Sequence, residues 1–247
     1  MIRTALSVAL AVISVTIASG SLMARPALTI DQLEFDFGYA PQNSKISHLF
    51  RLRNDGDDTL RITRVIPGCG CTQAPLRKST LAPGESTELE IIFNTGHYSG
   101  PVTKRPKIET NETSAQKNIT ILTNVVQRPD STYPVQTKPY KLDLSQFGET
   151  VRDEMKYTLA NVSDQDLDLT LVSCPDELLT VKVPKHIAAG ASANGLVKLT
   201  PTATGKSFET SITIQLNDKA ATRFTIPIKR SVYSPEKEVA SSGPDGK

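Results

Sequence analysis

The side chains best suited to chemistry in this sequence are two cysteines, Cys69 and Cys71, which flank a glycine in the stretch RVIPGCGCTQAPL at 64–76. In an extended strand, residues two apart point to the same side, so both sulfurs would face one way. Their Cα atoms would lie about 6.5–7 Å apart, at the upper limit for a disulfide. Gly70 can adopt backbone conformations closed to other residues, and such a bend would bring the sulfurs within reach of each other or of one metal ion.

Metal binding and disulfide formation are the two chemical interpretations of this pair. Two thiolates suffice for a linear soft ion such as Cu(I), whereas a structural zinc needs four ligands. The histidines are isolated, although His97 follows a predicted strand and could approach the cysteines in space. A disulfide across so short a loop would be redox-active more often than structural. A thioredoxin-like role is disfavoured, because the spacing is C-x-C and no βαβ pattern surrounds it.

No catalytic set accompanies the cysteines. The sequence lacks a G-x-S-x-G elbow and a phosphate-binding glycine run, and NDGDD at 54–58 lacks the ligand spacing of a calcium loop. The net charge is +2, and no concentrated basic block marks a nucleic-acid-binding face. We therefore expect a protein that is not an enzyme, has no nucleic-acid partner and, copper apart, binds no cofactor.

The first residues have the anatomy of a secretory signal peptide, which we assign to 1–24. A positive start at Arg3 precedes an apolar run over 5–18, and small residues follow. That run is shorter than the roughly 20 residues needed to span a bilayer, and no later segment is apolar enough to do so. The mature chain is expected to lack a transmembrane segment and to be periplasmic or extracellular, where unprotected thiols are oxidised. Three cysteines cannot all pair within one chain.

The sequence repeats itself at an offset of about 105–110 residues, which indicates a tandem duplication. Four pairs of segments match: LEFDFGYA at 33–40 with LDLSQFGE at 142–149, FRLRNDGDDTLRITRV at 50–65 with YTLANVSDQDLDLTLV at 157–172, LAPGESTELEIIF at 81–93 with IAAGASANGLVKL at 187–199, and IETNE at 108–112 with IQLND at 214–218.

Each copy has the pattern of an all-β domain. Leu89, Ile91 and Phe93 alternate with largely polar neighbours, and turn signals such as APGES separate such runs. Short strands with turns every 8–12 residues predict two tandem immunoglobulin-like β-sandwiches. We place them at 27–126 and 140–233. Between them, 127–139 reads as a proline-rich linker, and the polar tail at 234–247 is predicted to be disordered.

The first copy carries a series of motifs in fixed order. They are Phe35-x-Phe37-Gly38, Phe50-Arg51-Leu52-Arg53-Asn54-x-Gly56, Leu60-x-Ile62, Cys69-Gly70-Cys71-Thr72, Leu81-x-Pro83-Gly84-Glu85-Ser86 and Thr110-Asn111. In this order and spacing the copy resembles the bacterial domain of unknown function 1573, a sandwich related to major sperm protein and the ASH domains. The resemblance implies an exported, often periplasmic or cell-surface protein, and it implies no reaction.

The second copy resembles a diverged member of the same family, since it lacks the CGCT motif. Cys174, followed by proline, stands at the matching place. A lone cysteine cannot chelate, and free cysteine packs as a small hydrophobe. We therefore predict that Cys69 and Cys71 pack as free thiols at the end of the sandwich, with a disulfide and a Cu(I) site as the alternatives.

The expected function is an exported, non-enzymatic protein-binding or structural module, whose partner is another exported or cell-envelope protein. The first alternative is a periplasmic Cu(I)-binding or redox protein that uses Cys69 and Cys71. The second is a pilus-type periplasmic chaperone, for which Lys104, Arg105 and Lys107 are the candidate carboxylate-binding bases.

Overall fold

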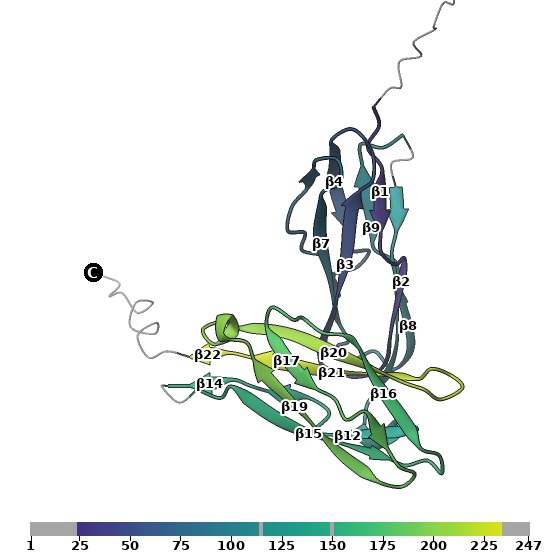
Figure 1. The fold of residues 1–247 in the computed structure, drawn as a ribbon, viewed down its shortest axis with the longest axis vertical. Coiled ribbons are helices and arrows are strands. Elements are labelled where there is room, and N and C mark those ends of the chain that lie inside the picture. Colours follow the sequence, from purple (N-terminus) through teal and green to yellow (C-terminus); the bar gives the residue numbers. More distant parts are fainter. Residues whose placement is uncertain (1–23, 114–115, 149–150, 234–247) are drawn as a thin grey trace, which may run out of the picture.

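The protein folds into two β-sandwiches that lie at an angle to each other (Figure 1). This computed structural model describes residues 24–113, 116–148 and 151–233. Within those ranges the regular elements are strands and two short 3-10 helices, with no α-helix. The predicted disordered tail and all but the last residue of the predicted signal peptide lie outside the described residues. No helix in the described part is long and apolar enough to cross a membrane.

The first sandwich buries the alternating apolar residues that the sequence predicts. In β7, Leu89, Ile91 and Phe93 are fully buried, while Glu88 and Glu90 are partly exposed. One sheet has the order β1-β3-β7-β5, a second β10-β9-β4-β6, and the strands β2, β11 and β8 complete the domain. The bounds are β1 Leu28–Ile30, β2 Glu34–Pro41, β3 Lys45–Asn54, β4 Leu60–Ile66, β5 Thr72–Gln73, β6 Thr80–Leu81, β7 Ser86–Asn94, β8 Gly100–Lys104, β9 Lys107–Thr110, β10 Gln116–Asn118 and β11 Thr120–Val126.

The second sandwich is built in the same way around Tyr157, Leu159 and Ile212. One sheet has the order β12-β15-β19-β17, and the facing sheet contains β18, β16, β20 and β21, with β13 beside β21. The bounds are β12 Val135–Lys138, β13 Leu142–Asp143, β14 Gln146–Phe147, β15 Glu154–Asn161, β16 Leu167–Ser173, β17 Leu179–Lys182, β18 His186–Ile187, β19 Ser192–Leu199, β20 Phe208–Leu216, β21 Arg223–Arg230 and β22 Val232–Tyr233; the 3-10 helices are η1 Pro129–Ser131 and η2 Pro201–Ala203.

The predicted linker at 127–139 is too long at its C-terminal end. Residues 135–138 form β12, which pairs with β15 and buries Val135 and Thr137. The prolines at 134 and 139 stand just outside this strand, where a missing N–H does not interrupt the ladder. The second sandwich thus begins at 135 instead of 140, and the connection covers 127–134.

A buried asparagine holds the same turn in both sandwiches. The side-chain amide of Asn54 donates to the carbonyls of Asp58 (2.8 Å) and Leu81 (3.0 Å). The amide of Asn161 donates to Gln165 (2.7 Å) and Ile187 (3.1 Å) in the second domain. These contacts recur at the offset of the sequence repeat. In each turn the amide bridges a carbonyl of an exposed residue and a buried carbonyl, that of Leu81 or of Ile187.

Replacing this asparagine should therefore cost stability. We expect Asn54→Ala to lower the free energy of unfolding by about 2 kcal/mol, because it removes a fully buried side chain and its hydrogen bond to the buried Leu81 carbonyl. Urea unfolding followed by circular dichroism measures the change. The exposed Asn118→Ala serves as the control and should shift it by less than about 0.5 kcal/mol. An equal loss of stability in Asn54→Ala and Asn118→Ala would contradict the role given to Asn54.

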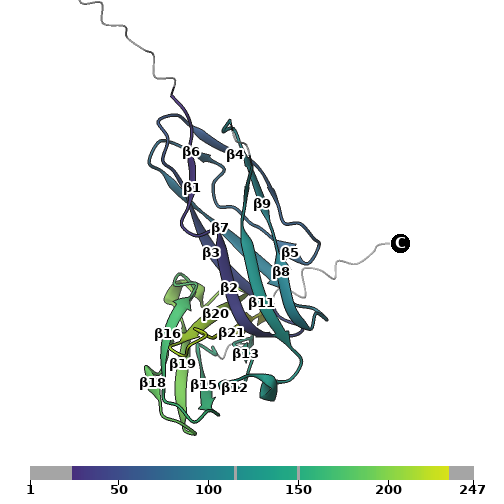
Figure 2. The ribbon, with the colours of Figure 1, turned by 90° about the vertical axis from the view of Figure 1, so that its right-hand side faces the viewer.

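One continuous sheet joins the two sandwiches, which the sequence did not predict. Strand β2 pairs in parallel with β21 through Tyr39 and Phe224, giving the order β18-β16-β20-β21-β2-β11-β8. Figure 2 shows β2 and β11 running down onto the region of β20 and β21. The Thr225 hydroxyl donates to the Phe37 carbonyl (2.6 Å) across this junction. The domains are therefore in direct contact through backbone and side chains.

Candidate functional site

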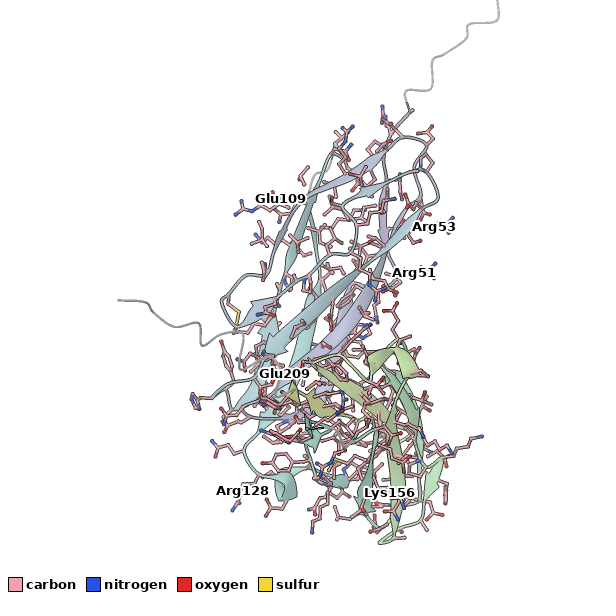
Figure 3. All side chains as sticks on the ribbon, turned by 90° about the vertical axis from the view of Figure 1, so that its left-hand side faces the viewer. Arg51, Arg53, Glu109, Arg128, Lys156 and Glu209 are labelled. Carbon is pink, nitrogen blue, oxygen red and sulfur yellow. A yellow bond between two sulfur atoms is a disulfide. The ribbon has the colours of Figure 1, made fainter. Side chains whose placement is uncertain are left out.

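Cys69 and Cys71 are joined in a disulfide, visible as the yellow bond in Figure 3. Their Cα atoms are 5.3 Å apart, closer than an extended strand would place them. The chain turns here, because the Thr72 amide donates to the Cys69 carbonyl (3.2 Å). The prediction of two packed free thiols is thus wrong for this pair, and the disulfide alternative is confirmed.

The glycine that shapes this loop is Gly68, and the expectation placed on Gly70 is wrong. Gly68 has a φ of 87°, in the left-handed region, whereas Gly70 has no positive φ. A side chain at Gly70 would meet no atom within 4 Å, so this residue faces open space beside the disulfide. The loop therefore bends before the first cysteine and leaves the disulfide approachable on the side of Gly70.

These two glycines should respond differently to the same substitution. Gly68→Ala is expected to lower the free energy of unfolding by about 1 kcal/mol, since an L-residue is disfavoured at its φ. Gly70→Ala is the matched control and should change it by less than about 0.5 kcal/mol. Thermal or urea unfolding of the oxidised proteins decides the matter. If Gly70→Ala lowers the free energy of unfolding more than Gly68→Ala does, Gly68 is not the glycine that shapes the loop.

The two cysteines are anchored to different degrees. Cys71 precedes β5, and its carbonyl accepts from the Asn94 amide (2.8 Å) while its side chain packs against the first core. Thr72 is buried and pairs with Phe93 of β7. Cys69 lies in the turn between two exposed glycines. Both cysteines are half-buried, so the sulfur pair lies at the boundary between core and solvent.

Two hydroxyl groups lie against the sulfurs. The Thr72 hydroxyl is 3.3 Å from Cys69 Sγ, and it must be the donor because a disulfide sulfur carries no hydrogen. The Tyr98 hydroxyl donates to Cys71 Sγ at 3.6 Å. Lys104 Nζ in turn donates to the Tyr98 hydroxyl (2.9 Å) and lies 4.3 Å from the centre of its ring. An ammonium group thus polarises the phenol that touches Cys71.

This polar chain was missed at the level of sequence. Thr72 follows the cysteines directly and could have been included from its position alone. Tyr98 and Lys104 come from the β7–β8 connection and from β8, and no local spacing links them to the cysteines. The structure also places Arg105 and Lys107 near this loop: the Arg105 carbonyl approaches Gly68, and Lys107 pairs with Ile66 at its start. The three bases predicted for a chaperone cleft therefore border the disulfide.

The predicted metal site requires the two cysteines in their reduced form. Sulfurs bonded to each other offer no thiolate, so only the reduced pair could hold Cu(I). The described residues contain no group of three or more His, Cys, Asp and Glu side chains arranged to hold a metal ion. The backbone carbonyl of His97 accepts a hydrogen bond from the Gln42 side-chain amide (3.3 Å). The Cu(I) site stays a prediction.

The third cysteine behaves as a packing residue. Cys174 is free and packs against the core of the second sandwich. Burial, with a further contribution from the neighbouring Asp176, raises the pKa of its thiol to about 12. The thiol is therefore protonated at neutral pH, and protonated thiols are poor nucleophiles. Cys174 is therefore not a candidate for thiolate chemistry at neutral pH.

A histidine that the sequence treats as isolated lies at the contact between the domains. His48 stacks on Phe35 with ring centres 3.6 Å apart, and its Nδ1 is 2.8 Å from the Ser173 hydroxyl of the second sandwich. Burial, reinforced by the charge of Arg223, lowers the pKa of His48 to about 4. This imidazole is therefore neutral at physiological pH and helps to join the two domains.

Comparison with known proteins gives weak likenesses outside one family. No curated protein matches the sequence. Among solved structures, the chain is similar to the Vibrio cholerae VesB protease (20% identity, 40% of this chain and 31% of that chain, TM-score 0.33). It is also similar to WR4, a C. elegans MSP family member (15% identity, 40% and 100%, TM-score 0.32). A third likeness is to the human CEP192 ASH/PapD-like domain 7 (10% identity, 51% and 99%, TM-score 0.34).

These structural likenesses, with TM-scores below 0.5, carry no conclusion about function, and the chain spans less than a third of the VesB protease. The sequence match is of a different kind. Residues 28–125, which cover the first sandwich and the disulfide loop, match the family described as Protein of unknown function (DUF1573). The first domain of the chain is thus a member of the DUF1573 family.

Proposed function

We propose that this protein is an exported two-domain module whose Cys69–Cys71 pair exchanges electrons with the cysteines of a partner protein in the cell envelope. The observation that carries the proposal is the half-exposed disulfide, with a polarised hydroxyl against one of its sulfurs. Export follows from the predicted signal peptide at 1–24, and it places the pair in the periplasm or outside the cell. The pair would act as a stoichiometric electron carrier and not as an enzyme.

A structural role for this disulfide has little support in the geometry. The stabilisation that a cross-link gives by restricting the unfolded chain grows with the length of the loop it closes. This loop encloses one residue. The surrounding strands are already held by ladder pairs on both sides of the loop, Ile66 with Lys107 and Thr72 with Phe93. The fold therefore depends little on the sulfur bond, which is free to open and close.

The contacts also assign different roles to the two sulfurs. A thiolate of the partner attacks Cys69 Sγ and forms a mixed disulfide, while the Cys69–Cys71 bond breaks and its electron pair leaves on Cys71. The Tyr98 hydroxyl, polarised by Lys104, is placed to stabilise the Cys71 thiolate. The partner's second thiolate then attacks its own sulfur in the mixed disulfide and releases Cys69.

The two-electron exchange is balanced by this sequence. Cys69 and Cys71 finish as two thiols, and the two thiols of the partner finish as one disulfide. The two protons of the partner's thiols pass through solvent to Cys69 and Cys71. A reductant of the dithiol class is therefore the co-reactant that the proposal requires.

The test is a redox titration of the folded protein. Full-length mature protein carrying Cys174→Ser is equilibrated with mixtures of reduced and oxidised dithiothreitol and then alkylated. Intact mass spectrometry gives the number of alkylated thiols at each ratio. We expect a reversible transition of two thiols, with circular dichroism unchanged on reduction. A pair that opens only in denaturant would overturn the proposal. Tyr98→Phe should shift the transition towards the disulfide, because the Cys71 thiolate loses its donor.

A further inference from the structure

The surroundings of the disulfide are built from two stretches without any acidic residue. Segments 59–84 and 95–108 contain no Asp or Glu. The first supplies β4 and the disulfide loop, and the second supplies Tyr98, β8 and the start of β9. Both segments meet at the disulfide. Arg77 and Lys78 of the first are paired with Glu88, Glu177 and Glu85, whereas Lys104, Arg105 and Lys107 of the second have no acidic residue in their own segment.

Three of these bases form what we call the basic rim: Lys104, Arg105 and Lys107. Lys104 reaches Cys71 through the Tyr98 hydroxyl. The Arg105 carbonyl would lie 3.7 Å from a side-chain carbon built at Gly68, and Lys107 pairs with Ile66 at the start of the loop. The rim thus runs along the side of the disulfide loop formed by β8 and the beginning of β9.

The charges of this rim are available to a partner. Arg105 and Lys107 are exposed, and Lys104 is partly exposed. Within the described residues, none of the three has a carboxylate at ion-pair distance. The nearest acid along β9, Glu109, stands opposite Arg64 in the ladder. Figure 3 shows Glu109 farther from the second sandwich than the disulfide bond is.

We infer that the basic rim selects partner proteins whose reactive cysteines lie in an acidic surface. This inference rests on the proposed redox function and names the chemistry of its partner. Opposite charge raises the rate at which two proteins meet, and a clustered field can do so by about 10- to 1,000-fold at low ionic strength. Salt screens the effect, since the Debye length falls to about 3 Å at 1 M.

The experiment uses small thiols that differ only in charge. The reductants are two amidated pentapeptides with a central cysteine. One has four glutamates around the cysteine, and the other has four lysines. Stopped-flow mixing measures the rate at which each peptide reduces the oxidised protein. Each rate is divided by the thiolate concentration of the peptide, which corrects for differences in thiol pKa. It is then divided by the rate with neutral 2-mercaptoethanol, which corrects for differences between protein variants in the reactivity of the disulfide. For the wild-type protein in 10 mM salt, we expect the acidic peptide to react about tenfold faster than the basic one. In 1 M salt the ratio should fall below about twofold.

Two charge-reversal variants locate the effect. Arg105→Glu with Lys107→Glu should invert the ratio between the peptides. Lys156→Glu with Lys182→Glu makes the same change in net charge on exposed residues of the second sandwich and should keep the wild-type ratio. A wild-type ratio near one, or equal effects of the two double variants, would overturn the inference while 2-mercaptoethanol still reduces the protein. Failure of every thiol to reduce the native protein would overturn the proposed function itself.

Discussion

Gly38→Ala is expected to lower the free energy of unfolding by about 4 kcal/mol, the largest effect we predict for a single substitution. Gly38 has a φ of 63°, and a Cβ built there would lie 1.9 Å from the Arg223 carbonyl oxygen of β21. The clash is between the added Cβ, which is bonded directly to the backbone of β2, and a backbone oxygen of β21. Rotation of a side chain therefore cannot relieve it. The variant must separate β2 from β21 or distort the strand.

The consequence for the domain junction can be measured directly. Urea unfolding followed by tyrosine fluorescence gives the loss of stability, and limited proteolysis reports opening between the sandwiches. Gly205→Ala is the matched control, because that position has no positive φ and no atom within 4 Å of the added carbon. A Gly38→Ala protein within about 0.5 kcal/mol of wild type would show that β2 and β21 do not need this close approach.

Acidification should also weaken the protein through His48. The pKa of His48 is about 4 in the folded protein, against 6.5 for the unfolded chain. Below pH 6.5 the unfolded state gains a proton that the folded state does not accept until about pH 4. Stability that is fully present above pH 6.5 is therefore lost as the pH falls to about 4. The difference between these two pKa values corresponds to about 3 kcal/mol.

The comparison that isolates this effect is between wild type and His48→Gln. The free energy of unfolding should fall between pH 6.5 and 4.5 in both, because carboxylates also titrate, and it should fall less steeply in the variant. His97→Gln serves as the control for the loss of a histidine elsewhere in the first sandwich. Equal slopes for wild type and His48→Gln would refute the role given to this side chain.

The strands could be predicted from sequence because their signal is local. Alternation at Leu89, Ile91 and Phe93 directly reports the buried face of β7. Strand β12 was missed for the opposite reason: four residues between two prolines carry too short a pattern, and burial of Val135 depends on β15 being present. Local periodicity therefore predicted the two sandwiches, misplaced one boundary and did not reveal the sheet that joins them.

The site could be predicted only in part. The spacing of Cys69 and Cys71 pointed to this loop as the candidate site, but an extended-strand distance argued against a bond between the two sulfurs. A turn closed by the Thr72 amide brings the two Cα atoms close enough for a disulfide. No residue type in the loop predicts that turn. Tyr98, Lys104 and the partners of His48 come from distant segments, so their positions follow from tertiary packing alone.

The pairing of β2 with β21 has a consequence for how the molecule forms. Synthesis delivers β2 near the beginning and β21 near the end of the chain, and contacts between distant segments are the slow ones to establish. The first sandwich can complete its own core long before the edge of β2 finds its neighbour. Until then the backbone groups of that edge can pair with a strand of another molecule, and β21, the last strand but one to be synthesised, covers them.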